Sequence, residues 1–295
     1  MLVLAAAAAG LLLAATVCTA SPFDPHPLPP NSSPSPFFEG WFTRVVAPEH
    51  NLSVSVIVGD YRPAKGAAVT ELWACLLLDV GGRVTTKEAF LAPEGLRLTV
   101  SGGRNVTQPP KLGTPADFRW QHGNSSLVVR DNVSTLDFSF CEGGSGFRVR
   151  AELSERVPWD KSAPDSSGPE GWLEAADFVL PTHYYVQTLA SHAAFRIDPC
   201  GASDSQAAVQ GRGFAHQEAN WGGTFPSAWI WAQGIAPDGE VQLVLTAGEF
   251  DIAGITTKQS IIALRTPTLS ATFRNIDLVS TQAIRPLLVA FGLDF

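Results

Sequence analysis

The feature that most constrains this chain is a strand signal, an apolar run with β alternation, that recurs roughly every 8 to 15 residues. Each run is bounded by Gly, Pro, Asn or Asp, which favour turns. No stretch of about 12 or more residues shows a convincing helical period. The signals predict strands at 52–61, 69–80, 127–130, 136–140, 147–153, 184–197, 207–216, 228–234, 241–247 and 261–266. We therefore expect an all-β sandwich or barrel.

A polar stretch in the middle of the chain, PWDKSAPDSSGPEG, interrupts the strand signals from Pro158 to Gly171. It marks either a boundary between two β units or one long loop within a single fold. We take the boundary as the prediction, with an N-terminal β unit at 37–157 and a C-terminal β unit at 172–295. Only 16% of the residues are charged, against about a quarter in typical domains. This composition predicts a large apolar interior or cavity.

Residues 1–20 form an uncharged leader that holds an apolar run and ends on a small residue before Ser21. The pattern is typical of a cleaved signal peptide. The alternative is an uncleaved membrane anchor, but the first basic residue is Arg44, so no basic flank would orient one. No later segment has the ~18 uninterrupted apolar residues of a membrane span. The sequence predicts a secreted or lumenal protein that begins with a Pro/Ser-rich arm at 21–36 and has no stable span after cleavage.

Five of the seven asparagines lie in N-x-S/T sequons. Glycans are added to exposed sequons of chains in the secretory pathway, so this cluster agrees with the leader. Asn31 is the weakest acceptor, because a proline follows close behind it. The acceptors that we expect to carry glycans are Asn51, Asn105, Asn124 and Asn132.

Three of the four cysteines remain after the leader is removed. Cys75 lies in the apolar run LWACLLL and is expected to be a buried free thiol. Cys141 and Cys200 lie beside glycines in turn-like contexts. The sequence leaves open whether these two form a disulfide or remain thiols.

The charge and the missing motifs exclude several classes of function. A net charge of −8 without a Lys/Arg cluster offers no surface for nucleic acid. The nucleophile elbow, the Walker loop, the dinucleotide fingerprint and H-E-x-x-H are all absent. His216 and Glu218 form an H-x-E, but no P-C-x-x-C follows as in zinc deaminases. We expect no cofactor and no metal, although a metal on His183 and His216 is an alternative that the sequence leaves open.

The most informative segment is GRGFAHQEANWGGTFPSAWIWAQG, which spans Gly211 to Gly234. Alternate residues of an extended chain share a face, so His216, Glu218 and Asn220 should line one side. Trp229 and Trp231 should likewise point the same way. Polar groups beside two indoles suit an apolar but oxygenated small molecule. The competing interpretation is structural, with the indoles in a core and the polar groups bonded to loop amides.

Three motifs of this chain resemble motifs of the tocopherol cyclase family. N-W-G-G-x-F-P-x-x-W-x-W-x-Q at Asn220–Gln233 is similar to its central signature, and L-T-A-G follows at Leu245–Gly248. FFEGWF at Phe37–Phe42 resembles its F-F-E-G-W-Y/F motif. PTHYYVQ at Pro181–Gln187 is similar to its P-H-W-Q-V region, and the motifs occur in the family's order. In a departure from the family, only His26 remains of the histidine-rich stretch that plant members carry upstream.

The resemblance implies a lipocalin-like or calycin-like β fold around an apolar pocket. It also implies a cyclase that closes an oxygen heterocycle on a prenylated or polyketide-derived phenol, quinol or quinone methide. A carboxyl group protonates the alkene, and the phenol oxygen captures the cation. The candidate acids are Glu218 and Glu39, because burial among aromatic rings keeps a carboxyl neutral until use. His183 or His216 would take the phenol proton or orient the acid. The candidate substrate-binding residues are Trp41, Tyr185, Asn220, Trp221, Trp229, Trp231 and Gln233.

Three other functions remain open from the sequence. A pericyclic hetero-Diels-Alder reaction in the same pocket would need hydrogen bonds and shape but no strong acid. A lipocalin-like carrier would bind an apolar metabolite without chemistry. A secreted glycosidase is the weakest alternative, because a sugar cleft needs two carboxyl groups at a defined separation.

Overall fold

The computed structural model describes residues 21–26, 36–63, 71–100, 104–105, 113–165, 167–173, 180–201, 208–252, 254–275 and 277. The predicted leader at 1–20, the sequon at Asn31 and most of the predicted arm lie outside these residues. Asn105 is described only by its backbone.

The described residues form strands, turns and short 3-10 helices, among them Pro48–His50 and Pro93–Gly95, and contain no α-helix. The first strands are β1 (Phe37–Ala47), β2 (Leu52–Arg62), β3 (Glu71–Val80), β4 (Arg83–Leu91), β5 (Leu96–Val100), β6 (Arg104–Asn105), β7 (Asp117–His122) and β8 (Ser125–Arg130). The later strands are β9 (Val133–Glu142), β10 (Ser145–Ser154), β11 (Thr182–Pro199), β12 (Val209–Gly222), β13 (Ala228–Ile235), β14 (Gln242–Ile252), β15 (Ile255–Arg265) and β16 (Ser270–Arg274). The predicted all-β class is confirmed. No helix of the described part is long and apolar enough to cross a membrane.

Turn chemistry and alternation explain why these segments become strands. Buried and less buried residues alternate along β1 and β9, as expected where one face of a sheet is packed. Glycines with positive φ, Gly81-Gly82 and Gly143-Gly144, form the tight turns that follow β3 and β9.

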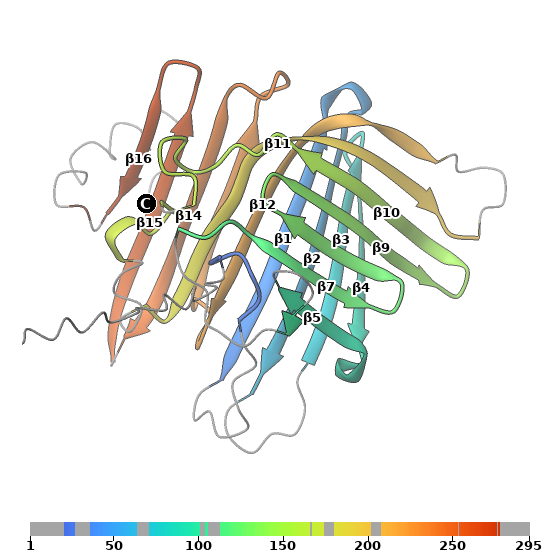
Figure 1. The fold of residues 1–295 in the computed structure, drawn as a ribbon, viewed down its shortest axis with the longest axis horizontal. Helices are drawn as coiled ribbons and strands as arrows, with labels where there is room; N and C mark the ends of the chain where they lie inside the picture. The colour runs from blue at the N-terminus through green and yellow to red at the C-terminus, as the bar shows by residue number, and fades with distance from the viewer. Residues whose placement is uncertain are drawn as a thin grey trace, which may run out of the picture.

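The strands form two antiparallel sheets (Figure 1). The large sheet has the order β4-β3-β2-β1-β12-β11-β10-β9-β8-β7-β5-β6, and it curls into a half-barrel. The smaller sheet runs β13-β14-β15-β16. The curled antiparallel sheet agrees with the predicted lipocalin-like or calycin-like architecture.

The change from one sheet to the other occurs after Gly222, not within Pro158–Gly171. β11 and β12 follow the polar stretch, yet they pair with β10 and β1 in the large sheet. The loop at 223–227 then leads into β13. Sheet membership therefore does not follow the two predicted β units, and a domain boundary at 158–171 stays a prediction.

The hollow of the large sheet is filled by an apolar core. Its largest fully buried side chains include Trp41, Trp120, Tyr185, Phe118 and Phe23. Phe23 comes from the start of the segment that was predicted to be an extended arm. Residues 21–25 are buried instead, because the phenylalanine fills space that the strands alone leave open.

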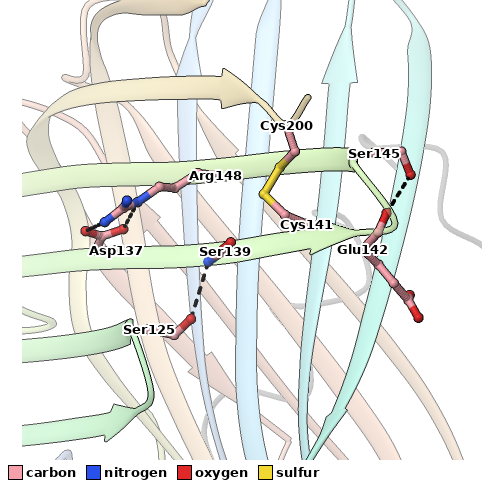
Figure 2. The surroundings of a disulfide bond; sticks show 8 residues. All are labelled: Ser125, Asp137, Ser139, Cys141, Glu142, Ser145, Arg148 and Cys200. Atoms are coloured by element: carbon pink, nitrogen blue, oxygen red, sulfur yellow. Dashed lines mark hydrogen bonds and ion pairs between the residues drawn. A yellow bond between two sulfur atoms is a disulfide. The ribbon is translucent and has the colours of Figure 1, made fainter. Parts of the chain in front are cut away.

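Cys141 and Cys200 form a disulfide, with their Cα atoms 5.7 Å apart (Figure 2). Cys141 lies near the end of β9 and Cys200 directly follows β11, so the bond reaches across the intervening strand β10. Cys75 is a buried free cysteine, as the apolar run around it predicts.

Candidate functional site

A cavity of about 740 Å³ lies where the two sheets face each other. Strands β1, β2, β11 and β12 of the large sheet form one wall, and β13, β14 and β15 form the opposite wall. Its lining is mostly apolar and includes the rings of Phe38, Phe42, Trp73, Trp229, Trp231 and Phe250. The volume lies within the range of small-molecule sites, and the lining suits an apolar ligand.

Strand register decides which side chains face this cavity. Residues directly opposite each other on paired strands share a face. Glu218 on β12 lies opposite Phe42 on β1 and Val186 on β11, and Asn220 lies opposite Gly40 and Tyr184. Glu218, Asn220 and Tyr184 therefore project on the cavity side, and all three line the cavity.

Glu218 is the centre of the polar contacts on this face. Its carboxylate is 4% exposed, and its Oε2 accepts hydrogen bonds from three donors. These are Tyr184 Oη at 2.7 Å, His216 Nε2 at 2.8 Å and Trp231 Nε1 at 3.1 Å. Among the described residues no hydrogen bond reaches Oε1. The donors thus anchor one carboxyl oxygen, and the other is left for a molecule in the cavity.

His216 acts here as a donor to Glu218. Its Nδ1 is buried and has no partner among the described residues. A neutral ring with its proton on Nε2 leaves only a lone pair unsatisfied, whereas a charged ring would bury an unpaired N–H. The ring does not line the cavity. The ring therefore contacts Glu218 without reaching the cavity itself, and the two predicted roles of His216, as acceptor of the phenol proton or as the group that orients the acid, stay predictions.

Tyr184 keeps its proton in this setting. Burial, followed by the nearby carboxylate of Glu218, raises the pKa of Tyr184 well above its ordinary value of 10.0. The hydroxyl therefore remains a hydrogen-bond donor at physiological pH.

Glu39, the second predicted acid, has its side chain on the opposite face of the large sheet. Phe42 lies opposite Glu218, and Glu39 is three positions from Phe42, so the alternation turns it away. Its carboxylate bonds the backbone N–H and Nδ1 of His26, the latter at 2.7 Å. Residue Glu39 contributes to the cavity wall, but its carboxylate does not stand beside that of Glu218.

Glu39 belongs to a polar row along the same face. Trp221 lies directly opposite Glu39 on one side and His183 on the other. The Trp221 ring lies 4.8 Å from that of His26 and 5.3 Å from that of His183. His183 Nδ1 lies 3.2 Å from a carboxylate oxygen of Glu170. This row joins β1, β12 and β11 on the face away from Glu218.

The placement of the remaining predicted residues follows the same alternation. Trp229 and Trp231 line the cavity. Trp41 is part of the wall, but its ring lies in the core and donates to the Phe23 carbonyl. Gln233 accepts a hydrogen bond from Arg44 at 3.0 Å. The predicted residues that do not line the cavity are His183, His216, Tyr185, Trp221 and Gln233.

One contributor to the cavity escaped the sequence-based prediction. Tyr184 lies inside the PTHYYVQ motif, but the predicted residues are its neighbours His183 and Tyr185, which face the other way. Asp60 is part of the cavity wall, but it lies directly opposite Glu39, so its carboxylate projects on the face of Glu39, where it pairs with Arg62 at 2.8 Å. Burial, partly offset by Arg62, raises the pKa of Asp60 to about 6. The sequence signal that could have identified Tyr184 is its place in the PTHYYVQ motif, two residues before Val186, which lies opposite Glu218.

The metal alternative on His183 and His216 is not supported by the geometry. The residue opposite His183 is Trp221, five positions from His216, so the two imidazoles project from opposite faces of the sheet. The described residues contain no group of three or more His, Cys, Asp or Glu side chains arranged to hold a metal ion.

The sequence model of the tocopherol cyclase-like family matches residues 35–274 of this chain. The chain belongs to the tocopherol cyclase-like family. The match includes all three motifs and every described strand, and it supports a cyclase-like role. No curated protein matches the chain.

Two solved structures of CghA share the fold of this family member at low identity. The crystal structure of CghA superposes with a TM-score of 0.56 at 12% identity, covering 86% of this chain and 67% of CghA. CghA with Sch210972 gives a TM-score of 0.55 at the same identity and coverage. A putative AttH from Nitrosomonas europaea gives 0.49 at 13% identity, covering 81% of this chain and 68% of that protein.

Proposed function

We propose that this chain is a cyclase that closes an oxygen heterocycle on an apolar, oxygenated substrate held between the two sheets. The substrate class is a prenylated or polyketide-derived phenol, quinol or quinone methide. One observation carries the proposal: a buried carboxyl group, Glu218, is anchored through one oxygen in an otherwise mostly apolar cavity. Membership of the tocopherol cyclase-like family supports the reaction class.

In the proposed reaction Glu218 both gives and takes back one proton. Its Oε1 proton adds to the substrate alkene, which leaves a carbocation on the substrate and a carboxylate on the enzyme. The phenol oxygen then forms the new C–O bond, and the phenol proton returns to the carboxylate. Substrate and product are isomers, so the cycle requires no oxidant or reductant.

The surroundings of Glu218 fit both charges that develop in this step. The three donors on Oε2 strengthen when the carboxylate forms, because charge-assisted hydrogen bonds are stronger than neutral ones. Trp231 and Trp229 line the same cavity, and their indole faces can stabilise a carbocation by cation–π attraction. Both effects favour the transition state over the bound substrate.

A pericyclic hetero-Diels-Alder reaction is the second candidate, and the same three donors favour it. The three donors would also stabilise Glu218 as a carboxylate throughout the reaction. In that case Oε1 would only accept a hydrogen bond from the substrate. Catalysis would then come from the shape of the cavity and the orientation of the reactants.

The decisive experiment is Glu218→Gln, assayed with a panel of prenylated quinols and quinone methide precursors in deuterated water. If Glu218 donates the proton, the chemical step should fall by at least about 100-fold, or ~2.7 kcal/mol of barrier. The unmodified enzyme should place deuterium on a product carbon. Glu152→Gln, an exposed position on β10, is the matched control and should leave turnover unchanged.

The other outcomes separate the alternatives. Near-full activity of Glu218→Gln with no carbon-bound deuterium would favour the pericyclic reaction. Saturable quenching of tryptophan fluorescence without turnover of any panel member would favour a carrier. Turnover of glycosides by the purified protein would overturn the proposal altogether.

A further inference from the structure

The segment at 21–26 is inserted into the core of the large sheet. Ser21 and Asp24 are each 1% exposed, and Phe23 is fully buried. The Phe23 ring lies 5.7 Å from that of Phe118, and its carbonyl accepts a hydrogen bond from Trp41 Nε1 at 2.9 Å. The segment is therefore part of the packed structure.

Asp24 is a buried carboxyl without a cationic partner among the described residues. Its Oδ2 accepts the backbone N–H of Ser21 and its Oδ1 that of Asp117, both at 2.9 Å. The charged groups that face it, Asp117 on β7 and Glu39 on β1, are both acidic. Burial, with a smaller contribution from these carboxylates, raises the pKa of Asp24 to about 7. A cation at this place would complete the site.

We propose that Ser21 is the first residue of the mature protein and that its α-ammonium group is the buried counter-ion of Asp24. The predicted signal peptide ends immediately before Ser21. Hydrolysis of the Ala20–Ser21 bond leaves a carboxylate on the released leader and an amine on Ser21. That nitrogen already lies 2.9 Å from Asp24 Oδ2, so cleavage places a positive charge directly at a buried carboxylate.

The consequence extends from this ion pair to the wall of the cavity. His26, two residues beyond Asp24, holds both oxygens of Glu39 through its backbone N–H and one of them through Nδ1. Glu39 in turn belongs to β1, the strand that lies beside β12. The processed terminus would therefore act as a positioning group. It would hold residues 21–26 in place and, through the contact of His26 with Glu39, also the polar row that contains Glu39, Trp221 and His183.

The first test needs no variant. The secreted protein should begin at Ser21 by mass spectrometry of its N-terminal peptide. In the native state its α-amine should resist acetylation by at least about tenfold relative to Lys258, whose side chain is 82% exposed. In denaturant the protection should disappear. A mature terminus at another residue, or an α-amine that reacts as fast as Lys258 in the native protein, would overturn the proposal.

The second test is a double-mutant cycle on secreted protein. An extra alanine before Ser21 removes the ammonium group from Asp24 but retains the peptide N–H, and Asp24→Asn removes the carboxylate. At pH 7 the extension should raise the unfolding equilibrium constant by at least about tenfold in the wild-type background, and by much less with Asp24→Asn. Equal effects of the extension in both backgrounds would mean that the two groups do not interact.

The pH dependence of stability separates loss of the ion pair from a steric effect of the added alanine, because only the ion pair depends on pH. In the extended protein the pKa of Asp24 is raised from 3.8 to about 7, so its protonated form stabilises the fold and that stability is lost as pH rises from about 4 to 7. In the mature protein the ammonium group opposes this loss. The difference in the free energy of unfolding between the mature and the extended protein should therefore increase from about pH 4 to pH 7. The neighbouring charged groups are present in both forms, so their titration cancels in this difference; they are Asp60, Arg62, His26 and Glu39. A difference that stays constant with pH would therefore contradict the ion pair.

Discussion

At the scale of single residues, the site depends on how one carboxyl oxygen is held. Glu218 Oε2 collects donors from β11, from β12 and from β13, and the last of these belongs to the other sheet. An indole N–H can only donate, so Trp231 specifies Oε2 as an acceptor. A change in any of these donors should therefore alter the reactivity of Glu218 more than the binding of an apolar substrate.

Tyr184→Phe tests this at the shortest of the three bonds. A hydrogen bond to a charged group contributes about 1.5–3 kcal/mol, so the chemical step should slow by about 10-fold to 100-fold with little change in apparent affinity. Tyr185→Phe is the matched control, because that ring lies in the core of the large sheet, and it should retain activity. Steady-state kinetics on both variants give the comparison. A larger loss in Tyr185→Phe would contradict the assignment of faces.

At the scale of elements, β12 is the strand on which the site depends, because it lies between β1 and β11 and carries Glu218. Gly213 allows the close approach of its neighbour. A Cβ at this position would stand 2.2 Å from the carbonyl oxygen of Val46, a backbone atom that cannot move aside cheaply.

Gly213→Ala should accordingly destabilise the protein by about 1–3 kcal/mol, the usual cost of overpacking. Gly234→Ala on β13 is the control, since its Cβ would only touch Leu243 at 3.8 Å, and it should stay within about 0.5 kcal/mol of the unmodified protein. Urea denaturation monitored by tryptophan fluorescence measures both. Equal stabilities of the two variants would contradict the prediction, because they would mean that β1 and β12 can move apart to admit the Cβ at position 213 without a measurable cost.

At the scale of the whole molecule, the exposed turns agree with the proposed passage through the secretory pathway. Asn51, Asn124 and Asn132 are exposed in turns between strands, as a glycan acceptor has to be. Asn105 lies in the short strand β6. The disulfide between Cys141 and Cys200 also suits an oxidising compartment.

Expressed with its leader in a eukaryotic host, the protein should emerge with glycans on at least three of Asn51, Asn105, Asn124 and Asn132. Glycopeptide mass spectrometry identifies the occupied sites, and Asn→Gln changes should remove them singly. Asn275, which is not in a sequon, provides the control position. A cytosolic, unmodified product would contradict the proposed localisation.

The sequence alone determined the all-β class and the grouping of residues within one strand. Its ten predicted strands correspond to β2, β3 and β8–β15, whereas β1, β4–β7 and β16 were not predicted. Alternation is a local property of an extended chain, so the order of residues is enough to place Glu218 with Asn220, and Trp229 with Trp231, on common faces. The motifs around them also identified the family, because these residues follow one another closely along the chain. That the two indoles of β13 meet Glu218 and Asn220 of β12 across one cavity depends in addition on how the two sheets face each other.

The tertiary structure decided everything that depends on how one strand meets another. Register between β1, β12 and β11 placed Glu39 and His183 on the face away from Glu218, and chose Tyr184 over Tyr185 for the cavity. A shift of one residue in such pairing exchanges the two faces of a strand, and no local pattern records it. The burial of residues 21–25 was equally non-local, because a short Pro/Ser-rich segment packs only when distant strands have left a space that its one phenylalanine fills.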